Sequence, residues 1–304
     1  MCDMLRNRLR AFLMLAFCGV SASAQSPATT DLRGSIEQIA RAAQGRVGVT
    51  ATVLETGASV AVQGDKRFPM QSVYKLPIGM AVLNQVDHGL LKLEQRIRVR
   101  RSDFVSSGQH SPIRDQHPRG VELSLDELLR FNVSDSDGTA CDVLLRIVGG
   151  AAVVDRYLHS LGIPDIHVAT TEKAMGRNQM VQYRNWATPA AMVALLRALQ
   201  NGRGLSTPSR TRLLNWMTET PTSSRRIKGL LPAGTLVAHK TGTSGTSAGL
   251  TRATNDVGLI TLPNGRHLAI AVFVSDSTAD DATREGVIAR IAQAAWEFWS
   301  RHGD

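Results

Sequence analysis

Strand-like segments lie at both ends of this chain, and a long helical block separates them. Residues 46–64 predict two strands joined by a turn at residues 55–57. Residues 229–275 predict three more strands, the last two joined by Pro-Asn-Gly at residues 263–265, a strong hairpin signal. Residues 68–214 carry helical periodicity and long loops instead. This order favours an α+β fold, in which both ends of the chain build one five-stranded antiparallel sheet around an inserted helical part.

Helices are also expected at both ends of the sheet-forming part. Residues 29–45 and residues 281–303 each carry apolar side chains at helical spacing. We therefore predict a discontinuous sheet domain of residues 25–67 and 216–304, flanked by terminal helices, and an inserted all-helical domain of residues 68–215. Because ligand sites occur preferentially at domain interfaces, function is expected in the groove between the two parts.

The first 24 residues have the three parts of a secretory signal peptide. A basic segment with three arginines precedes an apolar run at residues 11–20, and Ala-Ser-Ala at residues 22–24 offers a cleavage site. The apolar run is about half of the roughly 20 residues that a membrane-spanning helix needs. Residues 1–24 are therefore predicted to be removed. The product is expected to be secreted into the periplasm of a Gram-negative-type envelope and to have no membrane attachment.

The basic composition leaves a polyanion-binding envelope protein open as one alternative. The formal net charge of the whole chain is +9. The arginines are nevertheless scattered, with only short pairs such as Arg100-Arg101 and Arg225-Arg226, and no basic stripe is interleaved with aromatic side chains. We therefore expect no nucleic-acid partner.

Cysteine and histidine usage argues against metal or disulfide chemistry. After signal removal Cys141 is the remaining cysteine, so no intrachain disulfide is expected. It lies in an apolar run, where a cysteine usually behaves as a small buried hydrophobe. The sequence holds no HExxH and no paired CxxC motif. We expect neither a metal nor a cofactor.

Ser72 and Lys75 are the first candidate catalytic residues. They stand three residues apart where an apolar helix is expected to begin, so they lie one turn apart on the same face. Unpaired N–H groups at a helix N-terminus stabilise negative charge, and a nearby lysine can accept the serine proton if burial or other cations lower its pKa. By itself the pair is a weak signal, and a helix cap followed by a solvated lysine is the more common explanation of it.

Two further motifs stand later in the chain. Ser-Asp-Ser at residues 134–136 lies between two expected helices, and Lys-Thr-Gly at residues 240–242 lies on an expected strand. With Ser-x-x-Lys, these elements resemble the active-site signature of the penicillin-recognising serine enzymes, and of class A β-lactamases in particular. The resemblance extends from about residue 30 to the C-terminus. It includes residues 168–187, which look like the omega loop of class A, and it implies the β-lactamase/transpeptidase-like fold.

The resemblance implies a catalytic role for four residues. Ser72 would be the acyl-forming nucleophile, and Lys75 would be its proton partner. Ser134 would pass a proton to the departing ring nitrogen. Glu172, on the omega loop, would activate the water that hydrolyses the acyl-enzyme. The backbone N–H groups of Ser72 and Thr243 would form the oxyanion hole.

The resemblance also implies how substrate is held. Lys240 would supply positive charge where the substrate carboxylate and the transferred protons meet. Gly242 would allow substrate to approach the strand closely. Arg226 is a candidate second anchor for the carboxylate. The implied substrate-binding residues are Ser136, Lys240, Thr241, Gly242, Thr243 and Arg226.

Two positions depart from the commonest pattern of the family. Ser136 stands where an asparagine usually contacts the acylamide of the substrate, and a hydroxyl offers one donor where an amide offers two. Gly176 stands four residues after Glu172, where an asparagine commonly helps to hold the hydrolytic water. That water would then be held by Glu172, Ser72 and backbone groups.

The sequence thus predicts a secreted class A β-lactamase that acts as a monomer on small-molecule β-lactams and confers resistance to them. The closest alternative is a penicillin-binding D,D-peptidase, which forms the same acyl-enzyme but does not readily hydrolyse it. Glu172 argues against that alternative. A serine glutaminase shares the Ser-x-x-Lys pair, but the Lys-Thr-Gly motif and Glu172 fit it less well.

Overall fold

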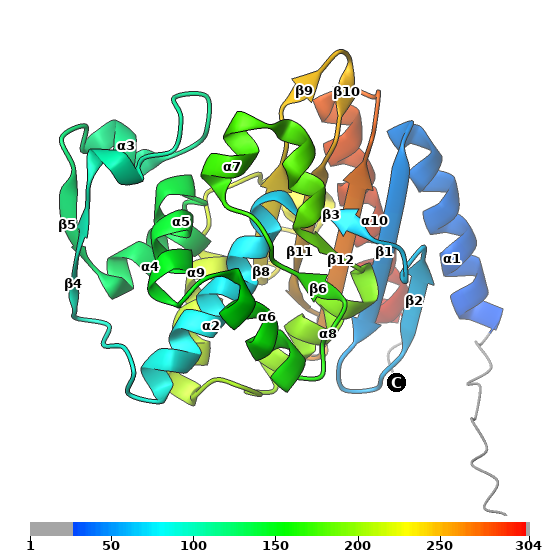
Figure 1. Ribbon diagram of the computed structural model, residues 1–304. Helices are drawn as coiled ribbons and strands as arrows, with labels where there is room; N and C mark the ends of the chain where they lie inside the picture. Colours follow the sequence, from blue (N-terminus) through cyan, green and yellow to red (C-terminus); the bar gives the residue numbers. More distant parts are fainter. Residues whose placement is uncertain (1–26, 302–304) are drawn as a thin grey trace, which may run out of the picture.

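The central element is a five-stranded antiparallel sheet that both ends of the chain build together. The computed structural model describes residues 27–301 (Figure 1). Strands follow the order β2-β1-β12-β11-β8, and every neighbouring pair is antiparallel. The sheet expected from the sequence is thereby confirmed, whereas the predicted signal peptide lies outside the described residues. The strands are β1 Arg46–Val53, β2 Ser59–Val62, β8 Val237–Thr243, β11 Thr254–Thr261 and β12 His267–Ser275.

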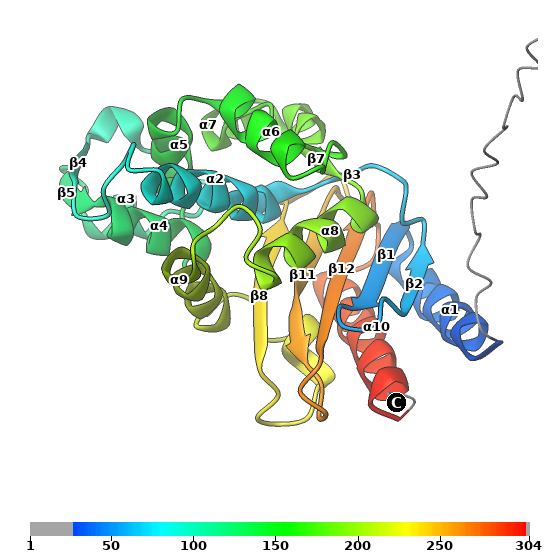
Figure 2. The same cartoon turned by 90° about the horizontal axis from the view of Figure 1, so that it is seen from below.

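The two faces of the sheet are covered by different helices (Figure 2). Helices α1 (Pro27–Ala40) and α10 (Asp281–Arg301) pack on one face, where Ile270 and Val272 of β12 join their core. The alternate residue Phe273 points to the opposite face and joins the core of the inserted helices. Because side chains alternate along a strand, β12 is buried on both faces and reads as a continuous apolar run.

The inserted part is mainly helical but not wholly so, which corrects the expectation of an all-helical domain. Short strands pair as β4–β5 and as β3–β7–β6. The predicted boundary between residues 215 and 216 falls within α9, and the division into domains stays a prediction.

The helices are α2 Lys75–Asp87, α3 Pro112–Gln116, α4 Leu125–Val133, α5 Gly138–Ile147, α6 Ala151–Ser160, α7 Glu172–Arg177, α8 Pro189–Gln200 and α9 Thr207–Thr218. The short strands are β3 Phe68–Pro69, β4 Arg96–Val99, β5 Val121–Ser124, β6 Ile166–His167 and β7 Trp186–Ala187. Two more, β9 Thr246–Ser247 and β10 Leu250–Thr251, pair beside the main sheet.

Several boundaries follow directly from local chemistry. Ser124 and Glu127 form the expected capping box at the start of α4, each side chain accepting from the other residue's backbone N–H. Pro189 opens α8, where its missing N–H costs no hydrogen bond. Gly265 has a φ of +81° in the β11–β12 hairpin, a conformation that glycine adopts without strain.

Helix α2 is the buried axis of the inserted part, and its N-terminus meets the sheet. Its first nine residues, from Lys75 to Leu83, are all buried. The 3₁₀ turn η2 (Gln71–Tyr74) precedes α2 and packs against β8. Pro77 falls in the first turn of α2, where it removes no helical hydrogen bond. The start of α2 is therefore fixed against an outer strand of the sheet.

Among residues 27–301, no helix is both long and apolar enough to cross a bilayer.

Candidate active site

Ser72 and Lys75 occupy the junction between η2 and α2. Ser72 lies on η2, and Lys75 is the first residue of α2. The Lys75 ammonium donates a hydrogen bond to Ser72 Oγ, with Nζ and Oγ 2.6 Å apart. Gln71, just before the serine, has a φ of +47°, and its side chain donates to Gln182 at 2.6 Å. The turn that presents Ser72 is thus held in a left-handed conformation by a contact to residues 168–187.

Lys75 also forms an ion pair with Glu172, the residue predicted to activate water. Both side chains are buried; Lys75 is 1% exposed and Glu172 is 7% exposed. Burial disfavours the ammonium, but the Glu172 carboxylate, together with other nearby acidic groups, outweighs burial and leaves the pKa of Lys75 above its ordinary value. The expected lowering of this lysine's pKa is therefore not what the structure gives. Lys75 is an ammonium that bridges the serine and the carboxylate.

The first turn of α7 positions Glu172. Thr171 caps the helix, its Oγ1 accepting from Ala174 N at 3.2 Å. The Asp142 carboxylate, on α5, accepts from the backbone N–H groups of Glu172 at 2.7 Å and Lys173 at 3.0 Å. An anion at a helix N-terminus satisfies these otherwise unpaired donors. Burial raises the pKa of Asp142 to about 6 despite these two hydrogen bonds.

Lys240 lies on β8 and is fully buried. Burial, reinforced by the positive charge of Lys75, lowers the pKa of Lys240 to about 7. Its Nζ donates to Ser136 Oγ at 2.8 Å and to Thr241 O at 3.1 Å. Lys240, rather than Lys75, is therefore the lysine that its surroundings bring close to neutrality.

The structure brings Ser136, rather than Ser134, to Lys240, and this corrects the expectation for Ser134. Ser134 ends α4 and is 2% exposed, and its carbonyl accepts from Thr220 Oγ1 at 2.7 Å. Ser136 follows with a φ of +59° and faces the cavity. Asp137 then caps α5, its Oδ1 accepting from Ala140 N at 2.8 Å. The stretch "SDSDG" contains Ser-Asp twice, once beginning at Ser134 and once at Ser136. This repeat is the sequence signal that the motif can also begin at Ser136.

Strand β8 lies against η2 so closely that residue 242 has to be glycine. A Cβ added at Gly242 would lie 2.4 Å from Met70 O and 3.1 Å from Ser72 N. The sequence predicts that Gly242 lets substrate approach the strand closely. In the structure, the missing side chain instead lets the backbone beside Ser72 pack against β8. Asn255, on β11, fixes the same turn by donating to Met70 O at 3.0 Å.

Arg226 is buried behind β8 and holds Thr243. Its Nη2 donates to Thr243 Oγ1 at 2.7 Å, and its Nη1 donates to Asn255 O at 2.9 Å. The Glu285 carboxylate is 3.3 Å from its Nε. Burial lowers the pKa of Arg226 from its ordinary value, and nearby carboxylates oppose that shift. Thr241 is also buried and donates to Thr222 Oγ1 at 3.0 Å.

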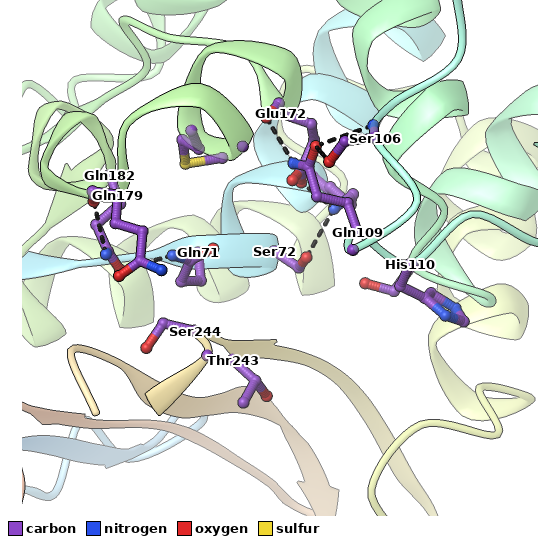
Figure 3. A pocket seen from close by; sticks show the side chains of 16 residues that line it. Gln71, Ser72, Ser106, Gln109, His110, Glu172, Gln179, Gln182, Thr243 and Ser244 are labelled. Atoms are coloured by element: carbon purple, nitrogen blue, oxygen red, sulfur yellow. Dashed lines mark hydrogen bonds and ion pairs between the residues drawn. The ribbon is translucent and has the colours of Figure 1, made fainter. Parts of the chain in front are cut away.

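Five of the predicted site residues line one cavity of about 510 Å³ (Figure 3). Lys240 reaches its wall through Ser136. Arg226 reaches it through Thr243. Sequence reasoning missed several polar residues of the wall, among them Gln71, Gln109, Gln179 and Gln182, because the motifs give no signal for them. The five predicted residues on the wall are Ser72, Lys75, Ser136, Glu172 and Thr243.

Comparison with known proteins agrees with this geometry. The model of the β-lactamase enzyme family matches residues 31–299. The chain belongs to this family. The extended-spectrum β-lactamase PER-1 of Pseudomonas aeruginosa is 43% identical over 288 residues, which are 94% of this chain and 92% of PER-1.

Solved structures of β-lactamases have the same fold. The structure of a β-lactamase from Chitinophaga pinensis DSM 2588 is 46% identical and has a TM-score of 0.86, over 88% of this chain and 98% of that one. A representative class A β-lactamase from Bacteroides cellulosilyticus DSM 14838 is 34% identical with a TM-score of 0.85, over 91% and 99% of the two chains. The predicted class A β-lactamase, a hydrolase of α+β fold, is thereby confirmed.

Two features of this β-lactamase lie outside the cavity. Cys141 is fully buried, as expected, and burial raises the pKa of its thiol well above the ordinary value. Arg98, Arg100, Arg101 and Arg119 line a second hollow of about 610 Å³, which shares no lining residue with the first. The arginines are thus less scattered than the sequence had indicated.

Within residues 27–301, no group of three or more His, Cys, Asp or Glu side chains could hold a metal ion.

Proposed function

We propose that this β-lactamase hydrolyses the β-lactam amide through an acyl-enzyme on Ser72 and a water activated by Glu172. The observation that carries the proposal is the position of Lys75, whose ammonium contacts both Ser72 Oγ and the Glu172 carboxylate. Nucleophile, proton carrier and base are then in direct contact on one cavity wall.

Acylation begins with a proton shift along these three side chains. Glu172 takes a proton from Lys75, and the neutral amine then takes the Ser72 proton as Oγ attacks the carbonyl carbon. The net result is transfer of the serine proton to the carboxylate. The negative charge on the carbonyl oxygen would be stabilised by the N–H groups of Ser72 and Thr243. Gly242 supports this arrangement, because its missing side chain lets β8 approach η2.

Cleavage of the ring amide needs a proton on the departing nitrogen, and Ser136 is suited to supply it. Its Oγ accepts from Lys240, so its own O–H hydrogen is left for donation to the nitrogen. Lys240, with a pKa of about 7, would then replace the proton that Ser136 gives up. We therefore assign to Ser136 the role that the sequence assigned to Ser134.

Thr243 is proposed to bind the substrate carboxylate. Because Thr243 Oγ1 accepts from Arg226, its hydroxyl hydrogen is free to be donated toward the cavity. Arg226 would thus anchor the carboxylate through Thr243 and through its charge. Thr241 donates to Thr222, so the substrate-binding role that the sequence implies for Thr241 requires its hydroxyl to rotate.

Deacylation completes the cycle. Glu172, neutral after the proton relay, returns to its carboxylate form once the nitrogen has been protonated through Ser136, Lys240 and Lys75. It then takes a proton from water, and the hydroxide attacks the ester carbonyl. As the bond between Ser72 Oγ and the acyl carbon breaks, Glu172 returns this proton to Oγ through Lys75. Export to the periplasm is part of the proposal, supported by the signal-like residues 1–24. Acting there as a monomer, the enzyme would confer resistance to β-lactams.

Turnover of a chromogenic cephalosporin tests the proposal, with Ser72→Ala as the control. Steady turnover that the variant lacks supports a hydrolase. A single stoichiometric burst would indicate the D,D-peptidase instead. Absence of both would leave the glutaminase or the polyanion binder, and the arginine-lined hollow is the feature that favours the latter.

A further inference from the structure

Gln109 connects the loop before α3 to the loop that carries Glu172. Its Nε2 donates to the backbone carbonyl of Glu172 at 2.6 Å. Its Oε1 accepts from the N–H of Ser106 at 3.3 Å and from the hydroxyl of Ser106 at 3.0 Å. Figure 3 shows the side chain reaching across the cavity wall toward Glu172. One amide therefore joins two segments 63 residues apart.

The space that Gln109 occupies is available only because residue 176 is glycine. A Cβ at Gly176 would lie 2.2 Å from Oε1 and 2.7 Å from Cδ of Gln109. Gly176 is within helix α7 and has no positive φ, so its backbone conformation does not require glycine. Glycine inside a helix costs roughly 1 kcal/mol relative to alanine. The glycine at position 176 is therefore explained by the side chain of Gln109, which fills the space that a Cβ would need.

Neighbouring contacts hold Gln109 in place. Arg114 donates to the backbone carbonyl of Gln109 at 2.8 Å and also to that of Ser106. The Lys173 ammonium donates to Ser102 O, so the loop is tied to α7 at a second point. Asp142 holds the first turn of α7 from the N–H side, while Gln109 holds it from the carbonyl side.

We propose that Gln109 is a positioning residue for Glu172, and that Gly176 and Gln109 act as a matched pair. This inference rests on the proposed role of Glu172 in deacylation. Gln109 fixes the carbonyl of Glu172, and thereby the direction in which its carboxylate meets water. An asparagine at position 176 would displace Gln109 rather than add a further water-holding group.

A double-mutant cycle tests this pairing. Acylation and deacylation rates of Gln109→Ala, Gly176→Asn and the double variant are measured with a slowly hydrolysed cephalosporin and mass spectrometry of the acyl-enzyme. Each single variant is expected to slow deacylation about tenfold and to leave acylation within about twofold. The double variant is expected to be no slower than the slower single variant, because both changes break the same contact. Unchanged deacylation in both single variants, or losses that multiply in the double variant, would overturn the proposal.

Two further variants separate the hydrogen bond from packing. Gln109→Glu keeps the shape but loses the N–H donor at neutral pH, so it should slow deacylation as much as Gln109→Ala does. Full activity of Gln109→Glu would contradict the proposed contact. Gln116→Ala, at an exposed glutamine of α3, is the matched control and should behave as the unmodified enzyme.

The role of Glu172 itself is checked separately with Glu172→Ala. If this variant accumulates no acyl-enzyme, the proposed function fails whatever Gln109 does. If Glu172→Ala accumulates acyl-enzyme and Gln109→Ala turns over normally, only the positioning role is wrong.

Discussion

Lys240 and Ser136 meet across the boundary between the sheet and the inserted helices, Nζ donating to Oγ at 2.8 Å. Ser136 reaches this position because its backbone has a φ of +59° between α4 and α5. A left-handed conformation at a residue other than glycine is uncommon, and it persists where the surrounding structure enforces it. Here the side chain of Ser136 contacts Lys240, and the next residue, Asp137, caps α5. The strained residue is the one to which the proposed mechanism assigns proton donation.

This relationship predicts unequal effects for the two serines of the "SDSDG" stretch. Ser136→Ala removes the hydroxyl that would donate to the ring nitrogen, so we expect kcat/KM for a cephalosporin to fall by about 10²–10⁴. Ser134→Ala changes a buried residue outside the cavity wall, and kcat/KM should stay within about threefold. Thermal melting of both variants checks that each is folded. A larger loss in Ser134→Ala than in Ser136→Ala would restore the original assignment.

The sequence was sufficient for the sheet and the terminal helices, and three of its four catalytic candidates, Ser72, Lys75 and Glu172, line one cavity. These rest on periodicity, on turn residues such as Gly265, and on motifs whose members lie a few residues apart. It was misleading at Ser134 because two overlapping Ser-Asp registers are locally equivalent. What distinguishes them is which hydroxyl meets Lys240, and that contact spans 104 residues.

Long-range packing also accounts for the other features that the sequence did not reveal. Gln109 carries no motif, and its partner lies on a different loop. Arg226 was identified as a cation near the substrate, but its hydrogen bonds to Thr243 and its pairing with Glu285 depend on how β8 and α10 pack. The pKa of Lys75 depends on its burial and on acidic groups around it, above all the Glu172 carboxylate that α7 brings to it. Local pattern contains none of this information.

The lowered pKa of Lys240 predicts an alkaline decline in kcat/KM. Its ammonium is present below about pH 7 and is lost as the pH rises through that value. Attraction for a substrate carboxylate therefore weakens above about pH 7, and kcat/KM, which reports the free enzyme, should fall there. Lys240→Arg keeps its charge across this range, so its decline should move to higher pH. Identical pH profiles for both enzymes would rule out this assignment.

The same titration affects stability with a defined sign. The folded pKa of Lys240 lies below its ordinary value of 10.5, so the unfolded chain binds more protons between about pH 7 and pH 10. This residue's contribution to the free energy of unfolding should therefore rise with pH across that window. In Lys240→Met the rise should be smaller, as measured by urea unfolding at pH 7, 8 and 9.

Asp142 predicts the opposite trend at acid pH. Burial raises its pKa from 3.8 to about 6, so between these values the folded protein binds more protons than the unfolded chain. Its contribution to the free energy of unfolding therefore falls as the pH rises from about 4 to 6. Asp142→Asn should flatten this part of the profile, measured by urea unfolding at pH 4.5, 5.5 and 6.5. The asparagine offers one acceptor oxygen where the carboxylate offers two, so deacylation should also slow, by about tenfold. An unchanged slope would count against the raised pKa.

Removing the carboxylate of Glu172 is expected to separate the two halves of the reaction. In the unmodified enzyme that carboxylate is what keeps the pKa of Lys75 high, against the effect of burial. In Glu172→Ala, burial acts on Lys75 without this opposition, so a larger fraction of Lys75 is neutral amine at neutral pH.

That neutral amine can take the Ser72 proton directly, so Glu172→Ala should still acylate. The carboxylate proposed to activate water is absent, so deacylation should fall by at least about 10³-fold. Mass spectrometry should therefore find a persistent adduct of the drug on Ser72 after mixing with a penicillin. Glu172→Ala combined with Lys75→Met should form this adduct far more slowly, because neither base is then present. Rapid turnover by Glu172→Ala alone would show that water is activated by another group.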